Sequence, residues 1–488
     1  MYFELKMTDY FSDFKPIRNR IMAMNLFDIL ADLVRLKKDK KPKSPEVIEF
    51  LYVNAIIYGT LLPSNREYNK NMYKVFNDSN SLLEKIDASL LDVDKNPFNW
   101  LYKYYINQSK AHTHNVIYQM FRYYTIFSET ILKKHIERVL GISYYDFFLG
   151  ALWIYSVFAI RSYCVKKSYF FSPNLSDSLF NHVNIGKILD ILSIKLENLK
   201  IQLKDSMVYD ENVFIFHKSQ HIVQPLFEYN NIYYCLYPEY LLKQITSGIY
   251  YLAEIYKPEY KLSGVFGKSF EKYIGQILLK NNMGNKYIIS EEIIYKRKKG
   301  QENDKTSDWI IISDEDIIFI ECKTKRTLRE FKFYTSSATY EEAIIHETSL
   351  ALKQIYKVYD DYRNDLIEAL PFDDSKNFVP ILVYLENDQL NFFNMDGKIT
   401  NELTNILNTN NIDSSLILKY PFHIYGSDEF EVDVQIMFKN GFYHYFDMMQ
   451  KGEIDVDFRT KFQYMNYYDD DFNREFIERN IINKDFKE

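Results

Sequence analysis

Residues that bend or interrupt secondary structure are scarce in this sequence. Only 14 of its 488 residues are glycine and 12 are proline, against an average usage of about 7% and 5%. Turns are therefore few, and we expect long helices. Cysteine is rarer still, because Cys164, Cys235 and Cys322 are the only three. Thiols so few and so far apart argue against a disulfide framework and a cysteine-based zinc site, and they predict a reducing, cytoplasmic environment.

Excess positive charge and long apolar runs are missing as well. The 60 lysines and arginines are outnumbered by 67 acidic residues, which gives a net charge of −7, so the whole-chain sum lacks the basic footprint of a nucleic-acid-binding protein. The most apolar stretch, residues 147–160, is shorter than the roughly 20 residues that span a bilayer. It predicts a buried helix. The first residues contain acids and no apolar core, so we expect neither a signal peptide nor a membrane partner.

The composition that remains is that of a folded protein with ordinary burial. Apolar residues make up 47% of the chain and charged residues 26%, which is typical of globular domains. The fold class that we predict is α+β, in four parts. Residues 1–210 form a helical domain that acts as a sensor, scaffold or oligomerisation module, and residues 211–260 form a connecting hairpin and helix. Residues 261–400 form an α/β core, and residues 401–488 a small α/β extension.

Four helices and one small antiparallel element can be predicted within residues 1–256. The first helix has Ser128 as its N-cap and ends at Gly141, with an apolar stripe between them. The second starts near Ser143 and is apolar nearly all round, and the third covers residues 178–204. Short alternating runs on either side of Asn230 and Asn231 predict a small antiparallel element, followed by a helix over residues 240–256.

The core region has a regular order of elements. We predict a helix over 265–280, strands over 286–295, 307–313 and 316–325, a long helix over 339–363 and a strand over 377–385. This order, αβββαβ, describes a mixed sheet with helices packed on it. Beyond it, alternation in residues 431–446 predicts a strand pair that turns at Asn440 and Gly441.

Charged residues interrupt two of the predicted core strands. Side chains alternate along a strand, so Asp308 shares a face with Ile310, and Glu321 shares a face with Lys323. A tight turn at residues 314–315 makes the two strands antiparallel neighbours, which brings the two carboxylates together. Adjacent carboxylates repel unless a cation lies between them, and hard oxygen ligands suit Mg²⁺, with Mn²⁺ as a substitute. A lysine beside them can orient or deprotonate water and offset charge on a phosphate, so these residues predict phosphodiester hydrolysis.

The same residues resemble the PD-(D/E)XK nuclease superfamily, which has the restriction-endonuclease-like fold. The resemblance rests on Asp308 in one strand, on Glu321-Cys322-Lys323 in the next, and on the αβββαβ order, and it covers about 120 residues. It implies that Asp308 and Glu321 bind the metal together with the backbone carbonyl of Cys322. It further implies that Lys323 positions and activates the attacking water, and that Glu271 on the first core helix completes the catalytic set.

The resemblance implies a Mg²⁺-dependent endonuclease of bacterial restriction or anti-phage defence. Its expected partners are a nucleic acid, with DNA before RNA, a protein of the same defence system and further copies of the chain. The basic segments 296–299 and 323–329 flank the predicted site, where they either hold a phosphate backbone or form solvated strand ends. One departure from the family pattern is Ser307, which stands where a proline commonly precedes the aspartate.

Other readings of the sequence stay open. The chain could be an RNA-cleaving, toxin-like effector, or a non-catalytic nucleic-acid-binding or assembly subunit with a decayed site. The pairs His112/His114 and His217/His221 lack a third metal ligand nearby, and no phosphate loop of the GxxxxGK[ST] type is present. The basic stretch 35–43 and the acidic stretch 469–471 are expected to be solvated, with a phosphate-contacting arm and an inhibitory tail as their respective alternatives.

Overall fold

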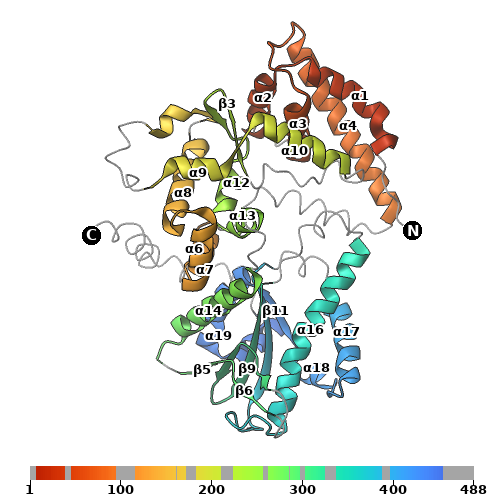
Figure 1. Ribbon diagram of the computed structural model, residues 1–488. Coiled ribbons are helices and arrows are strands. Elements are labelled where there is room, and N and C mark those ends of the chain that lie inside the picture. The colour runs from red at the N-terminus through yellow and green to blue at the C-terminus, as the bar shows by residue number, and fades with distance from the viewer. Residues whose placement is uncertain are drawn as a thin grey trace. The chain divides into compact units, whose positions relative to one another are not determined.

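The computed structural model describes residues 7–38, 45–94, 116–160, 162–171, 183–209, 224–256, 262–284, 286–296, 303–324, 337–386 and 396–453. The chain divides into two compact units. The first comprises Met1–Leu262 with Thr327–Ser337, and the second comprises Ser263–Arg326 with Ala338–Glu488. The fold is mixed α+β: the first unit is mostly helical with a four-stranded sheet, and the second is built on a five-stranded sheet with helices (Figure 1).

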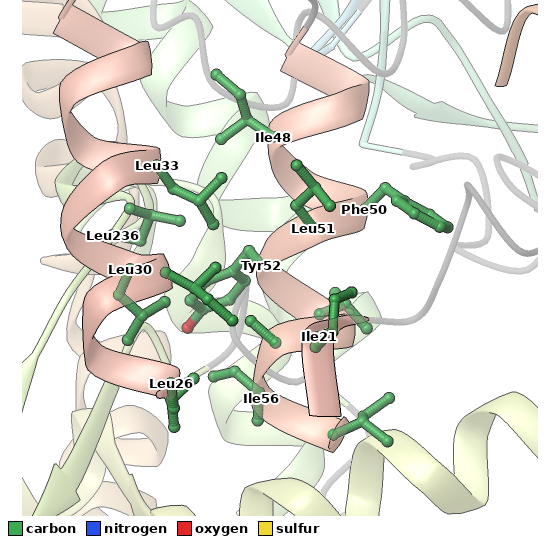
Figure 2. Packing of buried hydrophobic residues seen from close by; sticks show 14 of the residues in the cluster. Ile21, Leu26, Leu30, Leu33, Ile48, Phe50, Leu51, Tyr52, Ile56 and Leu236 are labelled. Atoms are coloured by element: carbon green, nitrogen blue, oxygen red, sulfur yellow. The ribbon is translucent and has the colours of Figure 1, made fainter. Parts of the chain in front are cut away.

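The first unit is built mainly from helices. They are α1 (Met7–Met22), α2 (Leu26–Lys38), α3 (Pro45–Tyr58), α4 (Tyr68–Asp94), α6 (Val116–Phe127), α7 (Thr130–Leu140), α8 (Tyr144–Ile160), α9 (Ile185–Leu192), α10 (Leu196–Tyr209), α12 (Pro238–Gln244) and α13 (Gly248–Tyr256). Figure 2 shows the core between α1, α2 and α3, where Leu30, Leu51 and Tyr52 are almost fully buried. Within the described residues no single helix could cross a bilayer, although α7 and α8 would suffice together if joined across their 64° bend.

The first unit is mostly helical, as predicted, but it also contains a small sheet, two of whose strands lie within the predicted helical region 1–210. Its strands are β1 (Cys164–Lys166), β2 (Ser193–Lys195), β3 (Leu226–Tyr229) and β4 (Ile232–Tyr234), in the order β1-β4-β3-β2. Strand β2 interrupts the helix predicted over 178–204, because Ser193–Lys195 pairs with β3. The predicted antiparallel element is confirmed for β3 and β4, whose turn residues Asn230 and Asn231 both have positive φ.

The helix predicted from Ser128 to Gly141 is close to α7 but differs at its start. Glu129 is the N-cap, and its carboxylate accepts a hydrogen bond from the Ile131 amide. Gly141 ends the helix in the left-handed conformation with φ 68°, as predicted. The buried stripe consists of Leu132, Ile136 and Leu140, whereas Ile131 is 54% exposed.

A five-stranded mixed sheet forms the centre of the second unit. Its order is β11 (His423–Gly426), β10 (Asn377–Tyr384), β9 (Asp316–Lys323), β8 (Trp309–Ile312), β5 (Ile288–Glu291). The pairs β5–β8 and β8–β9 are antiparallel, and β9–β10 and β10–β11 are parallel. A separate pair, β6 (Ile294–Tyr295) and β7 (Asp304–Lys305), follows β5.

Helices cover both faces of this sheet. On one side lie α14 (Ser263–Asn281), α19 (Ser427–Asn440) and α20 (Phe442–Gln450), and on the other α16 (Ser337–Arg363) and α17 (Asp396–Thr409) (Figure 1). A short helix, α18 (Leu416–Lys419), precedes β11. Helix α16 is the crossover between the parallel strands β9 and β10, as parallel pairing requires. The sequence of elements from α14 to β10 therefore contains the predicted helix, hairpin strands, long helix and strand.

The strand pair predicted over 431–446 is wrong. Those residues form the end of α19 and the start of α20, and Gly441, with φ 95°, separates the two helices. Helix α19 is buried along most of its length, including Phe430, Val434 and Met437. When a helix is enclosed on several sides its apolar residues lose the 3.6-residue period, so alternation is a poor guide to its structure. The chain after residue 400 instead contributes β11 to the central sheet.

Candidate active site

The β8–β9 hairpin places two carboxylates side by side. Its register pairs Trp309 with Ile320 and Ile310 with Phe319. The same register, carried one residue further, sets Asp308 opposite Glu321. Because side chains alternate, both carboxylates lie on the sheet face that carries Phe319, whose ring packs against Tyr362 of α16. A two-residue turn fixes this register, with the Ser313 amide bonded to the carbonyl of Asp316.

Asp308 is held by the backbone of the neighbouring strand. Its Oδ2 accepts a hydrogen bond of 2.8 Å from the amide of Cys322. Burial, and after it the negative charge of Glu271, raises the pKa of Asp308 to about 6. The Cys322 amide and the ammonium groups of Lys323 and Lys268 act in the opposite direction. Asp308 is therefore oriented as an anion by one donor in a setting that disfavours its charge.

Glu321 is more buried than Asp308, and only one of its two carboxylate oxygens accepts a hydrogen bond. Its side chain is 2% exposed. Its Oε1 accepts a hydrogen bond from Nζ of Lys323, while its Oε2 is buried without a hydrogen-bond partner. Burial and the charge of Asp308 raise the pKa of Glu321 to about 8, against the attraction of Lys323. A buried carboxylate oxygen with no donor is costly, so this site favours an added positive charge.

Lys323 completes the group. Burial alone would lower the pKa of Lys323, but Glu321 and Asp308 outweigh that effect and leave it raised. On the adjacent strand Tyr384 is its register partner, and the Tyr384 hydroxyl lies 3.0 Å from Oγ1 of Thr348 on α16. Lys323 is thus a protonated ammonium group at neutral pH, a third exposed, with a tethered tyrosine beside it.

Helix α14 brings two more charges to the same region. The Glu271 carboxylate pairs with Nζ of Lys268 at 2.6 Å, and the charge of Glu271 raises the pKa of both Asp308 and Glu321. The indole Nε1 of Trp309, next to Asp308, donates to the Glu271 carbonyl at 2.9 Å. A Cβ on Gly275, one turn later, would lie 2.0 Å from the ring of Trp309. Only glycine therefore lets the indole lie against α14 and hold the helix to β8.

The donor set agrees with a divalent cation in composition. Two carboxylates, those of Asp308 and Glu321, are oxygen donors of the kind Mg²⁺ takes, and Glu321 has an oxygen that lacks a donor. Within the described residues, no three His, Cys, Asp or Glu side chains form a metal-binding cluster. The predicted set is compatible with that finding, because its third donor is the backbone carbonyl of Cys322. The Cys322 thiol is buried, and burial followed by the charge of Asp308 raises its pKa well above the usual range.

The structure brings Asp308, Glu321 and Lys323 together on the β8–β9 hairpin. Glu271 lies on α14, where its carboxylate pairs with Lys268. Sequence reasoning missed Lys268. Its only signal was its position three residues before Glu271, which puts both on one face of a helix. Several sequence predictions lie outside the described residues: His112, His114, His217, His221, and the stretches 39–43, 297–299, 325–329 and 469–471.

Comparison of the whole chain with protein-family models, with curated proteins and with solved structures finds no match in any of the three. The function must therefore be argued from the residues and their geometry.

Proposed function

We propose that this protein is a Mg²⁺-dependent nuclease that hydrolyses phosphodiester bonds in DNA, and that its second unit has a restriction-endonuclease-like core. The order α14, β5, β8, β9, α16, β10 supports the proposal, because it follows the αβββαβ pattern of that fold. The defence role, the protein partner and the oligomer that the family resemblance implies stay predictions.

One observation carries the proposal. Asp308 and Glu321 are opposed on neighbouring strands, Glu321 is only 2% exposed, and the negative charge of Asp308 adds to burial in disfavouring the ionised form of Glu321. A structural ion pair would satisfy its carboxylate, yet Oε2 of Glu321 has no partner. Two repelling carboxylates with a spare oxygen are suited to a divalent cation, and the lysine beside them is suited to a phosphate.

The roles of the chain's own groups follow from their bonds. The Cys322 amide fixes the orientation of Asp308, and β9 fixes Glu321 opposite it. Lys323 gives one N–H to Glu321, and two of its three donors are left for a water or a phosphate oxygen. Because its pKa is raised, Lys323 is assigned to orientation and charge neutralisation and not to proton abstraction. A bound Mg²⁺ would supply Lewis-acid polarisation of the phosphate. In-line attack by water gives 5′-phosphate and 3′-hydroxyl ends.

The test compares nucleic acids and variants in the same assay. Purified full-length protein is incubated with Mg²⁺ and with supercoiled plasmid, linear duplex, single-stranded DNA or RNA, and the product ends are mapped. We expect wild type to cut DNA to 5′-phosphate ends, and Asp308→Ala and Lys323→Ala to be inactive. Asp314→Ala is the matched control, because Asp314 lies exposed in the turn at the other end of the same strands.

Three outcomes would contradict the proposal. Cleavage of RNA and not of DNA would favour the alternative that the protein is an RNA-cleaving, toxin-like effector. Equal cleavage by wild type and both site variants would indicate a contaminating nuclease or a different site. No cleavage of any substrate, together with no Mg²⁺ binding by calorimetry, would favour the non-catalytic alternative.

A further inference from the structure

A second lysine, Lys268 on α14, lies near the carboxylate of Asp308. Lys268 is 60% exposed and its Nζ bonds to Oε2 of Glu271 at 2.6 Å. Its ammonium group is close enough to Asp308 to oppose the rise in the pKa of that carboxyl. The turn of α14 that carries it touches the end of β9, because a Cβ on the preceding residue, Gly267, would lie 3.7 Å from Oγ1 of Thr324. Lys268 thus stands at the rim of the site, beside the strand end that carries Lys323.

A further exposed lysine, Lys305, is linked to Lys268 through the carboxylate of Glu292. The charge of Glu292 acts on Lys268, and Oε1 of Glu292 pairs with Nζ of Lys305 at 2.8 Å. Lys305 is half exposed and belongs to β7, which pairs with β6 immediately before Lys296. Lys268 and Lys305 therefore lie near the same carboxylate, that of Glu292.

We propose that Lys268 binds a backbone phosphate of the DNA strand next to the bond that is cut, and that Lys305 continues this contact along the strand. The inference rests on the proposed function and deepens it, since it assigns the path of the substrate. An exposed ammonium group has three donors, so the bond to Glu271 leaves two for phosphate oxygens. Glu271 holds the long side chain in place before DNA arrives, which reduces the entropy lost on binding.

A different role for Lys268 would be to neutralise Glu271 and nothing more. The two roles differ in what they predict for salt dependence. Each lysine–phosphate contact releases counterions and contributes about 0.9 to the slope of log affinity against log salt for duplex DNA. A lysine that only neutralises a carboxylate contributes no such term, and its loss should be cancelled when the carboxylate is also removed.

The experiment measures binding of a labelled DNA duplex by fluorescence anisotropy, with full-length protein in EDTA, where hydrolysis is not expected. Salt is varied between about 50 and 300 mM. We expect Lys268→Gln to weaken binding about five- to tenfold at 0.1 M salt and to reduce the slope by about 0.9. Lys268→Arg should keep the wild-type slope. Lys280→Gln is the control, since Lys280 lies in the last turn of the same helix, about 18 Å further along it.

Two additional measurements separate the outcomes. In the Glu271→Gln background, Lys268→Gln should still reduce the slope. In steady-state cleavage with Mg²⁺, Lys268→Gln should raise KM severalfold and change kcat by less than about twofold. If wild type binds and cuts DNA but Lys268→Gln keeps the wild-type slope, or if the loss disappears in the Glu271→Gln background, this inference is overturned and the proposed function stands. If wild type neither binds nor cuts DNA, both fail together.

Discussion

Asp308 and Glu321 are kept adjacent although burial disfavours the charge on both. The cost is visible in their pKa values: burial and the charge of Glu271 raise that of Asp308 to about 6, and burial and the charge of Asp308 raise that of Glu321 to about 8. Neither carboxylate has enough donors to offset that cost, because Asp308 receives one amide N–H and Glu321 one ammonium N–H. Strain of this kind in a group of titratable residues is typical of functional sites. A bound cation would remove the repulsion, so the same residues should respond both to pH and to metal.

The first prediction concerns the stability of the metal-free protein. The pKa of Asp308 is higher in the folded than in the unfolded protein, so the folded state binds more protons between about pH 4 and pH 6. Stability contributed by this group is present below that window and is lost as pH rises through it. Asp308→Asn removes the loss, and its unfolding free energy should exceed that of wild type by on the order of 2 kcal/mol above pH 6.

Thermal melts in EDTA from about pH 4.5 to 7.5 measure this difference. Tm of Asp308→Asn minus Tm of wild type should grow with pH and then level off, whereas the exposed Asp314→Asn should show no trend. Added Mg²⁺ should raise Tm of wild type and of Asp314→Asn, but not Tm of Asp308→Asn. If the Tm difference between Asp308→Asn and wild type were constant across this pH range, ionisation of Asp308 would not destabilise the folded protein.

The sequence was sufficient to predict the central residues because the hairpin leaves little freedom. Two residues of turn fix the register, and alternation then decides which side chains share a face. The prediction therefore brought Asp308, Glu321 and Lys323 together correctly. Lys268 escaped it, since a lysine on an exposed helix face has no pattern that separates a ligand contact from ordinary solvation. Its link to the site is its electrostatic effect on Asp308, which is 40 residues away in the chain.

At the scale of elements, the position of the site depends on how closely α14 approaches β8. Trp309 occupies the space over Gly275 and bonds to the carbonyl of Glu271. The indole thus links the strand that carries the site to the helix that carries Glu271 and Lys268. A side chain at position 275 would push these two elements apart.

The prediction at this scale uses two glycines of one helix. Gly275→Ala puts a methyl group 2.0 Å from the Trp309 ring, and such overpacking should destabilise the protein by about 1–3 kcal/mol. Gly264→Ala meets nothing within 4 Å and should be neutral or stabilising by up to about 1 kcal/mol. Urea unfolding followed by tryptophan fluorescence measures both. Equal stability of the two variants would show that Trp309 does not fix α14.

The elements that agree most closely with prediction are the hairpin β8–β9, which a two-residue turn defines, and the long helix α16. The clearest failure is α19, which is buried along most of its length and therefore lacks a periodic apolar stripe. Strand β2 was hidden in a predicted helix because its three residues pair with a strand about 30 positions later. Strand pairing between residues so far apart in the sequence is a tertiary interaction, so it leaves no signal in the local sequence.

At the scale of the whole molecule, net charge is a poor guide to the partner. The value of −7 averages over both units, and it counts as ordinary acids the two carboxylates that we assign to a cation. The exposed Lys268 pairs with Glu271 and acts on Asp308, and the exposed Lys305 pairs with Glu292. The first unit has a separate core formed by α1, α2 and α3, with no residue of the candidate site. The chemistry that we propose therefore belongs to the second unit.

The most direct test of the central claim is the initial rate of plasmid cleavage by full-length protein as a function of Mg²⁺. Wild type should be inactive in EDTA and should approach a saturating rate as Mg²⁺ is added. Asp308→Asn should be slower by at least about 100-fold at every concentration, while Asp314→Asn should follow wild type. A rate that is independent of Mg²⁺, or an Asp308→Asn variant as fast as wild type, would contradict the account.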